Sequence, residues 1–303
     1  MVAVAKRDTE QGVGTEEQTS ANGRLKKGGW LFRYSRLDAL LFLIAVLHVA
    51  GLVATAVWFE SLPVPALVLI GCVFMALCST NYQCVAHNFI HNPFFSREGL
   101  NHTFAVMNSI LLGMPQTLYR FHHLNHHKYN SDYRDPESGQ TKDYSSLYRF
   151  SRKPDEAENI WAYSFLGPFR MDFGILFGVA REKGLAWLVW IETFAFFAFY
   201  AGLAIYNWYA FLVFFVPVLF LGQVAALAEN YLEHKGANPT SRLTDSVSCY
   251  SAFYNFIWFN NGYHQEHHFR PYVHWAEIRE LKSRMLPESE RRVVRGSHLS
   301  NLF

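Results

Sequence analysis

Histidines at helical spacing are the residues of this chain that are best suited to carry chemistry. They form three groups: His87 and His91, then His122, His123, His126 and His127, then His264, His267 and His268. Residues three and four apart share one face of a helix, with Cβ atoms about 5–6 Å apart. Each group therefore presents two or three imidazoles to a common point, as a metal site requires. Imidazole suits iron, copper and zinc alike, so the spacing alone does not identify the metal.

Other polar residues near these groups are expected to complete a metal site. His234 follows a long apolar run and should lie at the depth of His87 and His91, so we expect it to be a further ligand. Asn230, one turn earlier, is expected to hold a metal-bound water. Asp135 and Glu266 are expected to orient ligands, because metal-bound histidines usually give their other N–H to carboxylates. No catalytic side chain is expected apart from the ligands, and the isolated His298 is expected to be solvated or to lie outside the ligand layer.

The composition indicates a membrane protein. Half of the 303 residues are hydrophobic and 17% are charged, whereas soluble domains carry about a quarter charged residues. The net charge of +2 gives no indication of nucleic-acid binding. Four apolar runs, at about 39–59, 62–82, 185–206 and 208–229, each reach the roughly 20 residues that a helix needs to cross a bilayer. The histidine groups lie outside these runs.

The distribution of charge predicts the sidedness of the four spans. All 27 Lys and Arg fall in residues 1–36, 86–184 or 230–303, and neither short connection between paired spans contains one. Under the positive-inside rule these three regions are cytoplasmic, and so are both termini. We therefore expect an all-α integral membrane protein, with four transmembrane helices in two hairpins and a cytoplasmic helical cap that carries the metal site. Residues 1–36 would be a polar cytoplasmic tail, disordered over the first 25 residues, and 37–303 a single membrane-embedded domain.

Three further segments lead to structural expectations. The apolar stretch 104–118 is too short to span, so it should lie in the interface or dip into the protein. Aromatic residues at a spacing of four make 156–182 a membrane-surface helix, interrupted at Gly167 and Pro168. Glu192, inside the third span, is expected near its outer end, where it can reach water.

At these motifs the chain resembles the membrane fatty acid desaturase and hydroxylase superfamily. Its members carry one HxxxH or HxxxxH box and two HxxHH-type boxes on the cytoplasmic face of four-span proteins, and the similarity covers about residues 40–285. The third group reads Asn261-Gly-Tyr-His-Gln-Glu-His-His268, with Pro271 close behind, and resembles the third box of acyl-lipid and sphingolipid desaturases. The stretch Asn230-Tyr-Leu-Glu-His234 is instead similar to a motif of membrane alkane hydroxylases.

The second group fits both kinds of enzyme. His123, His126 and His127 give the HxxHH of desaturases, while His122 with the last two gives the HxxxHH of hydroxylases. The choice between His122 and His123 as a ligand therefore stays open, and with it the choice between the two reactions.

The resemblance implies two non-haem iron ions and an oxygen-dependent lipid desaturase that introduces a C=C bond into a fatty acyl chain. The alternatives are a hydroxylase, monooxygenase or ketolase acting on an alkane, acyl chain or carotenoid, and, from another class, a histidine-rich metal transporter. The chain has no haem-domain motif, cysteine set or GxGxxG, so a separate ferredoxin or cytochrome-type donor is implied. Its docking face, or a stripe facing anionic lipid, would be formed by Arg134, Lys142, Arg149, Arg152 and Lys153. The implied membrane is a bacterial inner membrane or the endoplasmic reticulum.

Overall fold

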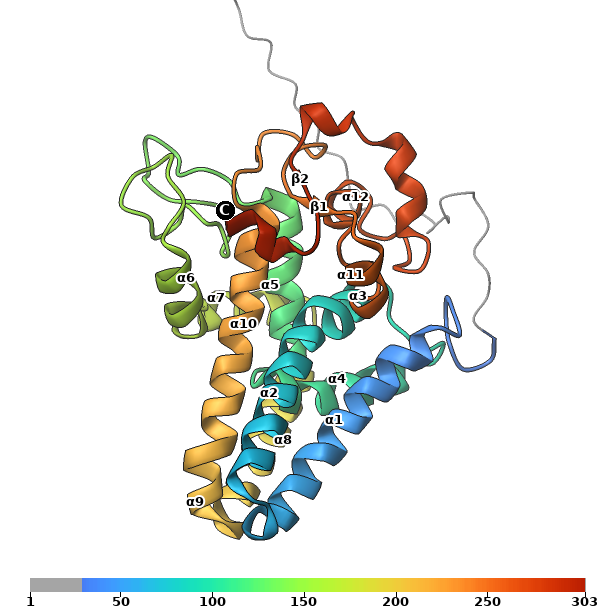
Figure 1. Cartoon of the computed structure of the whole chain (residues 1–303), viewed down its shortest axis with the longest axis vertical. Coiled ribbons are helices and arrows are strands. Elements are labelled where there is room, and N and C mark those ends of the chain that lie inside the picture. The colour runs from blue at the N-terminus through green and yellow to red at the C-terminus, as the bar shows by residue number, and fades with distance from the viewer. Residues whose placement is uncertain (1–28, 303) are drawn as a thin grey trace, which may run out of the picture.

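Four long apolar helical stretches form the lower part of the molecule in Figure 1. They are Asp38–Ser61, Val64–His91, Ala186–Tyr206 and Trp208–His234, each long and apolar enough to cross a membrane. The computed structural model describes residues 29–302, and within them the strands are two short pairing partners, β1 (Ser248–Cys249) and β2 (Val293–Val294). The prediction of a helical protein with four apolar spans is confirmed.

The second and fourth stretches continue beyond their predicted ends at 82 and 229. The second consists of α2 (Val64–Thr80), the π-helical segment η2 (Asn81–Ala86) and α3 (His87–His91). The fourth consists of α9 (Trp208–Ala210), the π-helical segment η4 (Phe211–Phe215) and α10 (Val216–His234). The first and third are α1 (Asp38–Trp58) with η1 (Phe59–Ser61), and α8 (Ala186–Tyr206). Helical hydrogen bonding thus continues past the apolar part of each sequence. As a result, His87, His91 and His234 lie at the ends of two long helical stretches.

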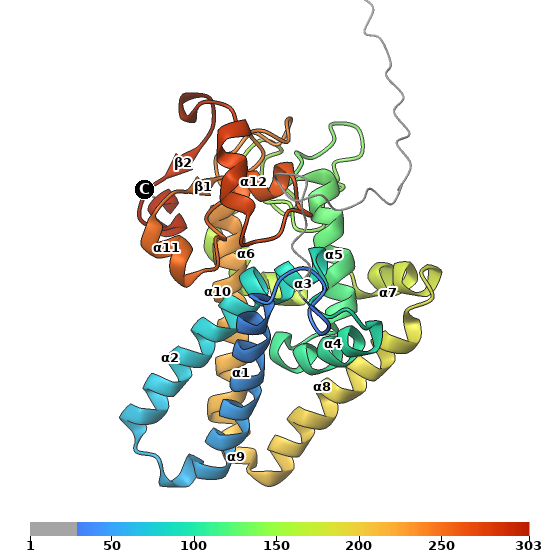
Figure 2. The same ribbon diagram turned by 90° about the vertical axis from the view of Figure 1, so that its right-hand side faces the viewer.

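The short connections between paired spans lie at the same end of the molecule, as Figures 1 and 2 both show. Asn207 Nδ2 donates a hydrogen bond of 3.2 Å to Glu60 Oε1 and joins the two connections. The outward faces of the spans carry exposed apolar side chains, including Leu47 (60% exposed), Phe194 (74%) and Ile205 (87%). An exposed apolar surface of this kind suits contact with lipid rather than with water.

Close packing between α2 and α10 fixes the relative position of the two helices that lead into the histidine region. A Cβ built on Gly222 would lie 2.6 Å from Cys78 Cβ, so only glycine permits this approach. Further along, Gln83 Nε2 donates to the Ala226 carbonyl at 2.8 Å. The ends of these helices, with His87 and His234, are therefore held side by side.

The short apolar stretch 104–118 forms no span of its own. It is divided between α4 (Glu98–Leu112) and α5 (Gln116–Tyr129), with Gly113 in the left-handed region (φ +73°) between them. Figure 2 shows α4 lying across the bundle beside α1 and α8. Its buried Asn108 exchanges hydrogen bonds with Asn81 and donates to Gln116 Oε1 at 2.8 Å. These partners satisfy the amide inside an apolar bundle.

Shorter segments form a cap over one end of the spans (Figure 1). They are α6 (Ile160–Leu166), η3 (Gly167–Phe169), α7 (Phe173–Glu182), α11 (Ala252–Ile257), α12 (His264–Phe269), η5 (Ile278–Arg284), η6 (Glu288–Glu290) and η7 (His298–Leu302). The expected surface helix at 156–182 is thus three pieces, broken at Gly167 and Pro168 as its sequence suggested.

Only part of the predicted tail lies among the described residues. Residues 1–28 lie outside the described residues. The expectation of disorder, which concerns the first 25 residues, therefore lies outside them too. The last part of the predicted tail packs against the chain after α3: Arg33 N donates to the Phe94 carbonyl at 2.8 Å, and Ser96 N donates to the Leu31 carbonyl at 2.9 Å. These backbone hydrogen bonds place residues 31–33 in the folded structure.

Glu192 does not reach water, contrary to expectation. Its side chain is completely buried on α8, where Oε2 accepts from Thr117 N at 2.9 Å and Oε1 accepts from Thr117 Oγ1 at 2.7 Å. A carboxylate at the N-terminal turn of α5 is also favoured by the helix dipole. Glu192 therefore attaches the helix of the second histidine group to the third span.

Replacing Glu192 by leucine is expected to destabilise the protein by about 1–3 kcal/mol, because it leaves two buried donors of Thr117 without a partner. The measurement is the thermal unfolding midpoint in detergent. Thr193→Ala is the matched control, since the Thr193 hydroxyl bonds only to its own helix, at the Val189 carbonyl. Equal midpoints for the Glu192 variant and the native chain would contradict this role.

Candidate metal centre

Nine of the histidines converge on two adjoining clusters between the spans and the cap. The first cluster consists of His87, His91, His123, His127 and His267, and one nitrogen from each lies within 4.8 Å of the others. The second cluster consists of His126, His234 and His268, grouped by the same criterion, together with His264, whose Nε2 lies 3.2 Å from His234 Nε2. The rings of His127 and His268 are 4.5 Å apart and join the two clusters. All nine side chains are buried.

Helical periodicity distributes the histidines between the clusters. On α5, His123 and His127 are four residues apart and share a face toward the first cluster, while His126 points to the second. On α12 the arrangement is reversed: His264 and His268 face the second cluster and His267 faces the first. α3 adds its pair His87 and His91 to the first, and α10 adds His234 to the second. A single HxxHH box thus serves both clusters.

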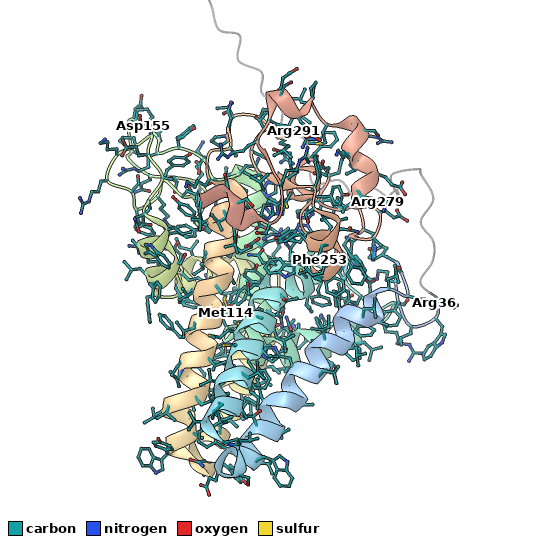
Figure 3. The ribbon with its side chains drawn as sticks, viewed as in Figure 1. Arg36, Met114, Asp155, Phe253, Arg279 and Arg291 are labelled. Atoms are coloured by element: carbon teal, nitrogen blue, oxygen red, sulfur yellow. The ribbon has the colours of Figure 1, made fainter. Side chains whose placement is uncertain are left out.

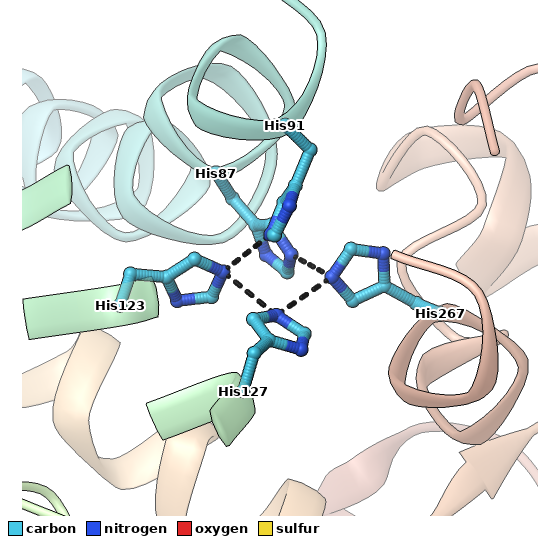
Figure 4. Close-up of side chains that lie close together, drawn as sticks. All are labelled: His87, His91, His123, His127 and His267. Carbon is cyan, nitrogen blue, oxygen red and sulfur yellow. Dashed lines mark hydrogen bonds between the residues drawn. The ribbon is translucent and has the colours of Figure 1, made fainter. Parts of the chain in front are cut away.

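The nitrogen atoms of the first cluster are spaced as the ligands of one ion would be (Figure 4). The Nε2 atoms of His87 and His267 lie 2.6 Å apart, and His123 Nε2 lies 2.8 Å from His91 Nε2 and 2.9 Å from His127 Nε2. Two nitrogens bound to one ion at about 2.1 Å, at right angles, are about 3.0 Å apart. Five imidazoles directed at one point fit a transition-metal ion.

The second cluster contains a buried polar atom that a metal would satisfy. His268 is 1% exposed, and its Nε2 has no hydrogen-bond partner among residues 29–302. Its ring lies 4.8 Å from that of His234 and 4.7 Å from that of His264. His126 Nε2 and His234 Nε2 are 3.0 Å apart. An unpaired nitrogen at this depth would be costly without a cation at the centre of the cluster.

The cap histidines are in the protonation state that metal binding needs. Burial, followed by the neighbouring imidazoles, lowers the pKa of His264, His267 and His268 well below the usual range. The same causes act on the pKa of His123 and His127. These rings are therefore neutral at pH 7, and a neutral ring offers a lone pair to a metal ion.

Three carboxylates other than those expected lie beside the clustered histidines. Asp143 is fully buried, and its Oδ2 lies 2.8 Å from His126 Nδ1. Burial alone would raise the pKa of Asp143, but the adjacent His126 and the hydrogen bonds from Ser145 hold it below its usual value. Asp245 Oδ1 lies 3.6 Å from His268 Nδ1, and Glu233 Oε1 lies 3.6 Å from His264 Nδ1. These three carboxylates face the outer nitrogens of second-cluster rings.

Of the three missed carboxylates, only Glu233 had a signal in the sequence, because it directly precedes His234. Asp143 and Asp245 lie in irregular loops, at separations from the histidines that follow no helical pattern. His234 itself donates through Nδ1 to the backbone carbonyl of Asp245, at 3.0 Å. The loops therefore orient the ligands through contacts that spacing does not reveal.

The predicted supporting residues occupy other places. Asp135 is exposed and caps its own turn, where its Oδ1 accepts from the backbone N–H groups of Glu137 and Ser138. Glu266 is buried, but it accepts from Ser248 and Tyr250, and within residues 29–302 its carboxylate forms no hydrogen bond or ion pair with a histidine. Its role in the structure is to hold α12 against β1.

Asn230 lies one turn before His234 and lines the cavity described below. Its Nδ2 donates to Tyr163 Oη at 2.8 Å, and Tyr163 Oη donates to the Ser145 carbonyl at 2.8 Å. With Nδ2 committed in this way, the amide oxygen of Asn230 remains available to accept a hydrogen bond. That is compatible with the water-holding role expected from the sequence.

His122 and His123 have different surroundings. His123 belongs to the first cluster, whereas His122 belongs to neither and faces Tyr144, with ring centres 6.4 Å apart. Adjacent residues on a helix point about 100° apart, so only one of them can face the cluster. Burial lowers the pKa of His122 to about 4, so this ring is also neutral.

His298 is neither solvated nor a member of either cluster. It is completely buried, with Nδ1 2.9 Å from Glu229 Oε1 and Nε2 3.0 Å from the Val247 carbonyl. Through these contacts η7 packs against α10, just outside the second cluster. Of the two places expected for His298, solvent or a position outside the ligand layer, the structure excludes the first.

A cavity of about 250 Å³ leads to both clusters. Its inner wall includes His87 and His123 of the first cluster and His126 and His264 of the second. Apolar residues from η3, α7 and α10 line much of the rest, including Phe169, Phe173, Phe220 and Leu227. A long apolar molecule in this cavity would therefore contact histidines of both clusters.

Comparisons with known proteins agree with one another, because the matching family model and two similar proteins are all described as desaturases. The family model described as fatty acid desaturase matches residues 61–298. A sphingolipid delta(4)-desaturase of Schizosaccharomyces pombe (strain 972 / ATCC 24843) is 26% identical over 231 residues, which cover 70% of this chain and 59% of the relative. One of Candida albicans (strain SC5314 / ATCC MYA-2876) is 24% identical over 221 residues, 65% of this chain and 56% of the relative. The chain thus spans less than two thirds of the length of these relatives, and no solved structure matches it.

Proposed function

The chain belongs to the fatty acid desaturase family, and from this premise we propose that it is a membrane oxidoreductase that introduces a C=C bond into the acyl chain of a lipid. The observation that carries the proposal is the cavity, because histidines of both clusters line it and its remaining wall is largely apolar. An unactivated C–H bond gives acids, bases and nucleophiles nothing to act on, so its cleavage requires a redox metal.

The nine clustered histidines would hold two iron ions, five facing one and four facing the other. Bound iron would supply the redox chemistry that allows O2 to remove hydrogen from a saturated chain. The overall reaction takes a –CH2–CH2– unit, O2, two electrons and two protons to –CH=CH– and two molecules of water. The electrons would come from a separate carrier of the ferredoxin or cytochrome type.

The protein's own residues would position the chain and exclude water. Phe173, Phe220 and Leu227 provide the apolar wall along which a saturated chain can lie. Asp143 would hold the Nδ1 proton of His126, which leaves Nε2 of that ring facing the second cluster. Asn230 would hold a water molecule beside the same cluster.

We further propose that the cap lies on the cytoplasmic side of a bacterial inner membrane or of the endoplasmic reticulum, with residues 37–303 forming one membrane-embedded domain. The charged residues labelled in the upper part of Figure 3, such as Arg279 and Arg291, lie away from the spans, with Met114 below them. The short connections at residues 62–63 and 207 contain no Lys or Arg, whereas residues 92–185 and 235–302 contain many, which supports this orientation. The histidines lie at the ends of the spans, whereas a transporter would place its ligands at mid-membrane.

Lipids from a host that expresses the chain with an electron carrier are expected to gain products lighter by two hydrogen atoms than their saturated parents. Mass spectrometry of total lipid extracts checks this. The matched control is His267→Ala, which removes a first-cluster nitrogen and should give no new product. Products that gain only oxygen would contradict desaturation and indicate hydroxylation.

A further inference from the structure

The mouth of the cavity lies where its lining residues become exposed. Phe150, Phe169 and Phe173 are the strongly exposed members of the lining, at 45%, 76% and 45%. Arg170, which also lines the cavity, is adjacent to Phe169 in the chain. A molecule entering the cavity would therefore pass between these three rings and beside one guanidinium group.

One side of this mouth is apolar and continuous with the surface of the spans. On α6, Trp161 is 69% exposed and Leu166 is 46% exposed. Phe220 of α10 packs against Phe165 and Phe169, with ring centres 6.1 and 5.8 Å away. An exposed aromatic surface next to a membrane span belongs at the lipid–water boundary. The hydrocarbon part of a membrane lipid can thus approach the mouth along this apolar surface.

The other side of the mouth carries two arginines whose charges are already neutralised. Arg170 Nη1 donates to both carboxylate oxygens of Glu158, at 2.8 and 2.9 Å, and the Arg170 guanidinium lies 4.4 Å from the Phe150 ring centre. Arg149 Nη1 donates to Asp172 Oδ2 at 2.7 Å and lies 5.2 Å from the same ring. Glu158 is 8% exposed, so its charge is committed to Arg170.

The remaining polar groups around the mouth are uncharged. Apart from Arg170, no Lys or Arg lines the cavity in the part of the chain that the structure describes. Ser145, Ser146 and Tyr144 are there instead, with Asn230 deeper inside. A phosphate would have to compete with Glu158 in a partly buried ion pair in order to gain a cation, whereas a hydroxyl or amide group could donate to the oxygens of these neutral partners.

We propose that the cavity takes a membrane lipid with an uncharged head group bearing hydroxyl or amide groups, and that the Glu158–Arg170 pair is a specificity determinant against anionic head groups. This inference rests on the proposed lipid desaturation. It extends that function by naming the substrate class and the residues that select it. The pair acts by neutralising Arg170, the cation of the cavity lining that a phosphate would otherwise bind.

The test compares two lipids that differ only in head-group charge: an N-acyl dihydrosphingoid with a free primary hydroxyl, and the same lipid with that hydroxyl phosphorylated. Iron-loaded protein in neutral-lipid nanodiscs, with an electron carrier, is expected to give a kcat/KM at least about tenfold higher for the uncharged lipid. In Glu158→Gln the guanidinium of Arg170 is free. This variant should lower KM for the phosphorylated lipid about tenfold, as one charge-assisted hydrogen bond can.

Glu156→Gln is the matched control, because Glu156 pairs with the exposed Lys153 on the same loop and does not line the cavity. It should leave the preference unchanged. If Glu158→Gln does not fold, Asp172→Asn frees Arg149 on the other side of Phe150 and should shift the preference in the same direction. The double change Glu158→Gln with Arg170→Gln removes the arginine of the cavity lining, leaves Arg149 paired with Asp172, and should restore the preference for the uncharged lipid.

The outcomes separate this inference from the function on which it rests. Equal use of both lipids by the native chain, or an unchanged preference in Glu158→Gln and Asp172→Asn, would overturn the specificity role while leaving desaturation intact. Double bonds in neither lipid, nor in any host lipid, would instead overturn the proposed function.

Discussion

Replacing His123 by alanine is expected to abolish double-bond formation and to remove iron from the protein. His123 Nε2 is 2.8 Å from His91 Nε2 and 2.9 Å from His127 Nε2, so its loss opens the middle of the first cluster. Loss of a residue that merely supports a metal ligand costs about 10–100-fold in affinity or activity. A ligand should cost more, so we expect activity to fall by more than about 100-fold. Iron per chain and product yield are the two measurements.

His122→Ala is the matched control for this change, because it removes the same side chain one position earlier on α5. Its ring belongs to neither cluster, so iron content should stay close to that of the native protein. His122 does line the cavity, so product yield or KM can change in this variant. Loss of iron in His122→Ala but not in His123→Ala would reverse the assignment and favour the hydroxylase pattern.

Replacing Asp143 by asparagine is expected to lower iron affinity about 10–100-fold, because the carboxylate fixes the orientation and protonation of His126. Asp143 Oδ2 lies 2.8 Å from His126 Nδ1 and also accepts from Ser131 N at 2.6 Å. An asparagine amide that directs its nitrogen at His126 would offer a donor where an acceptor is needed. The measurement is iron retained against a graded series of chelator concentrations.

Asp135→Asn is the control, since Asp135 was the carboxylate that sequence reasoning favoured. It is exposed and bonds only within its own turn, so this change should not alter iron retention. If the Asp135 variant lost iron and the Asp143 variant kept it, the geometry of the second cluster described above would be wrong.

Local features of the sequence were sufficient for the general character of the protein. The apolar runs predicted four spans, and four helices of the required length and hydropathy are present. Helix spacing alone predicted that His87 and His91 share a face, and that each HxxHH box presents several imidazoles together. Both inferences depend on interactions within a few residues of the chain, namely helical hydrogen bonding and burial of apolar side chains. Boundaries were less accurate, since α3 and α10 extend the second and fourth spans to His91 and His234.

Tertiary structure decided how the motifs combine. The rotation of α5 and α12 against α3 and α10 decides which of their imidazoles meet. It also decides that His123 rather than His122 joins the first cluster. The contacts of Asp143 and Asp245 with His126 and His268 arise from loops whose distance along the chain from these partners obeys no periodicity. Burial of Glu192 and His298 likewise depends on partners far away in the sequence, Thr117 and Glu229. The residues next to a side chain in the sequence determine on which face of its helix it lies. The surface against which that face packs is determined by the folding of the whole chain.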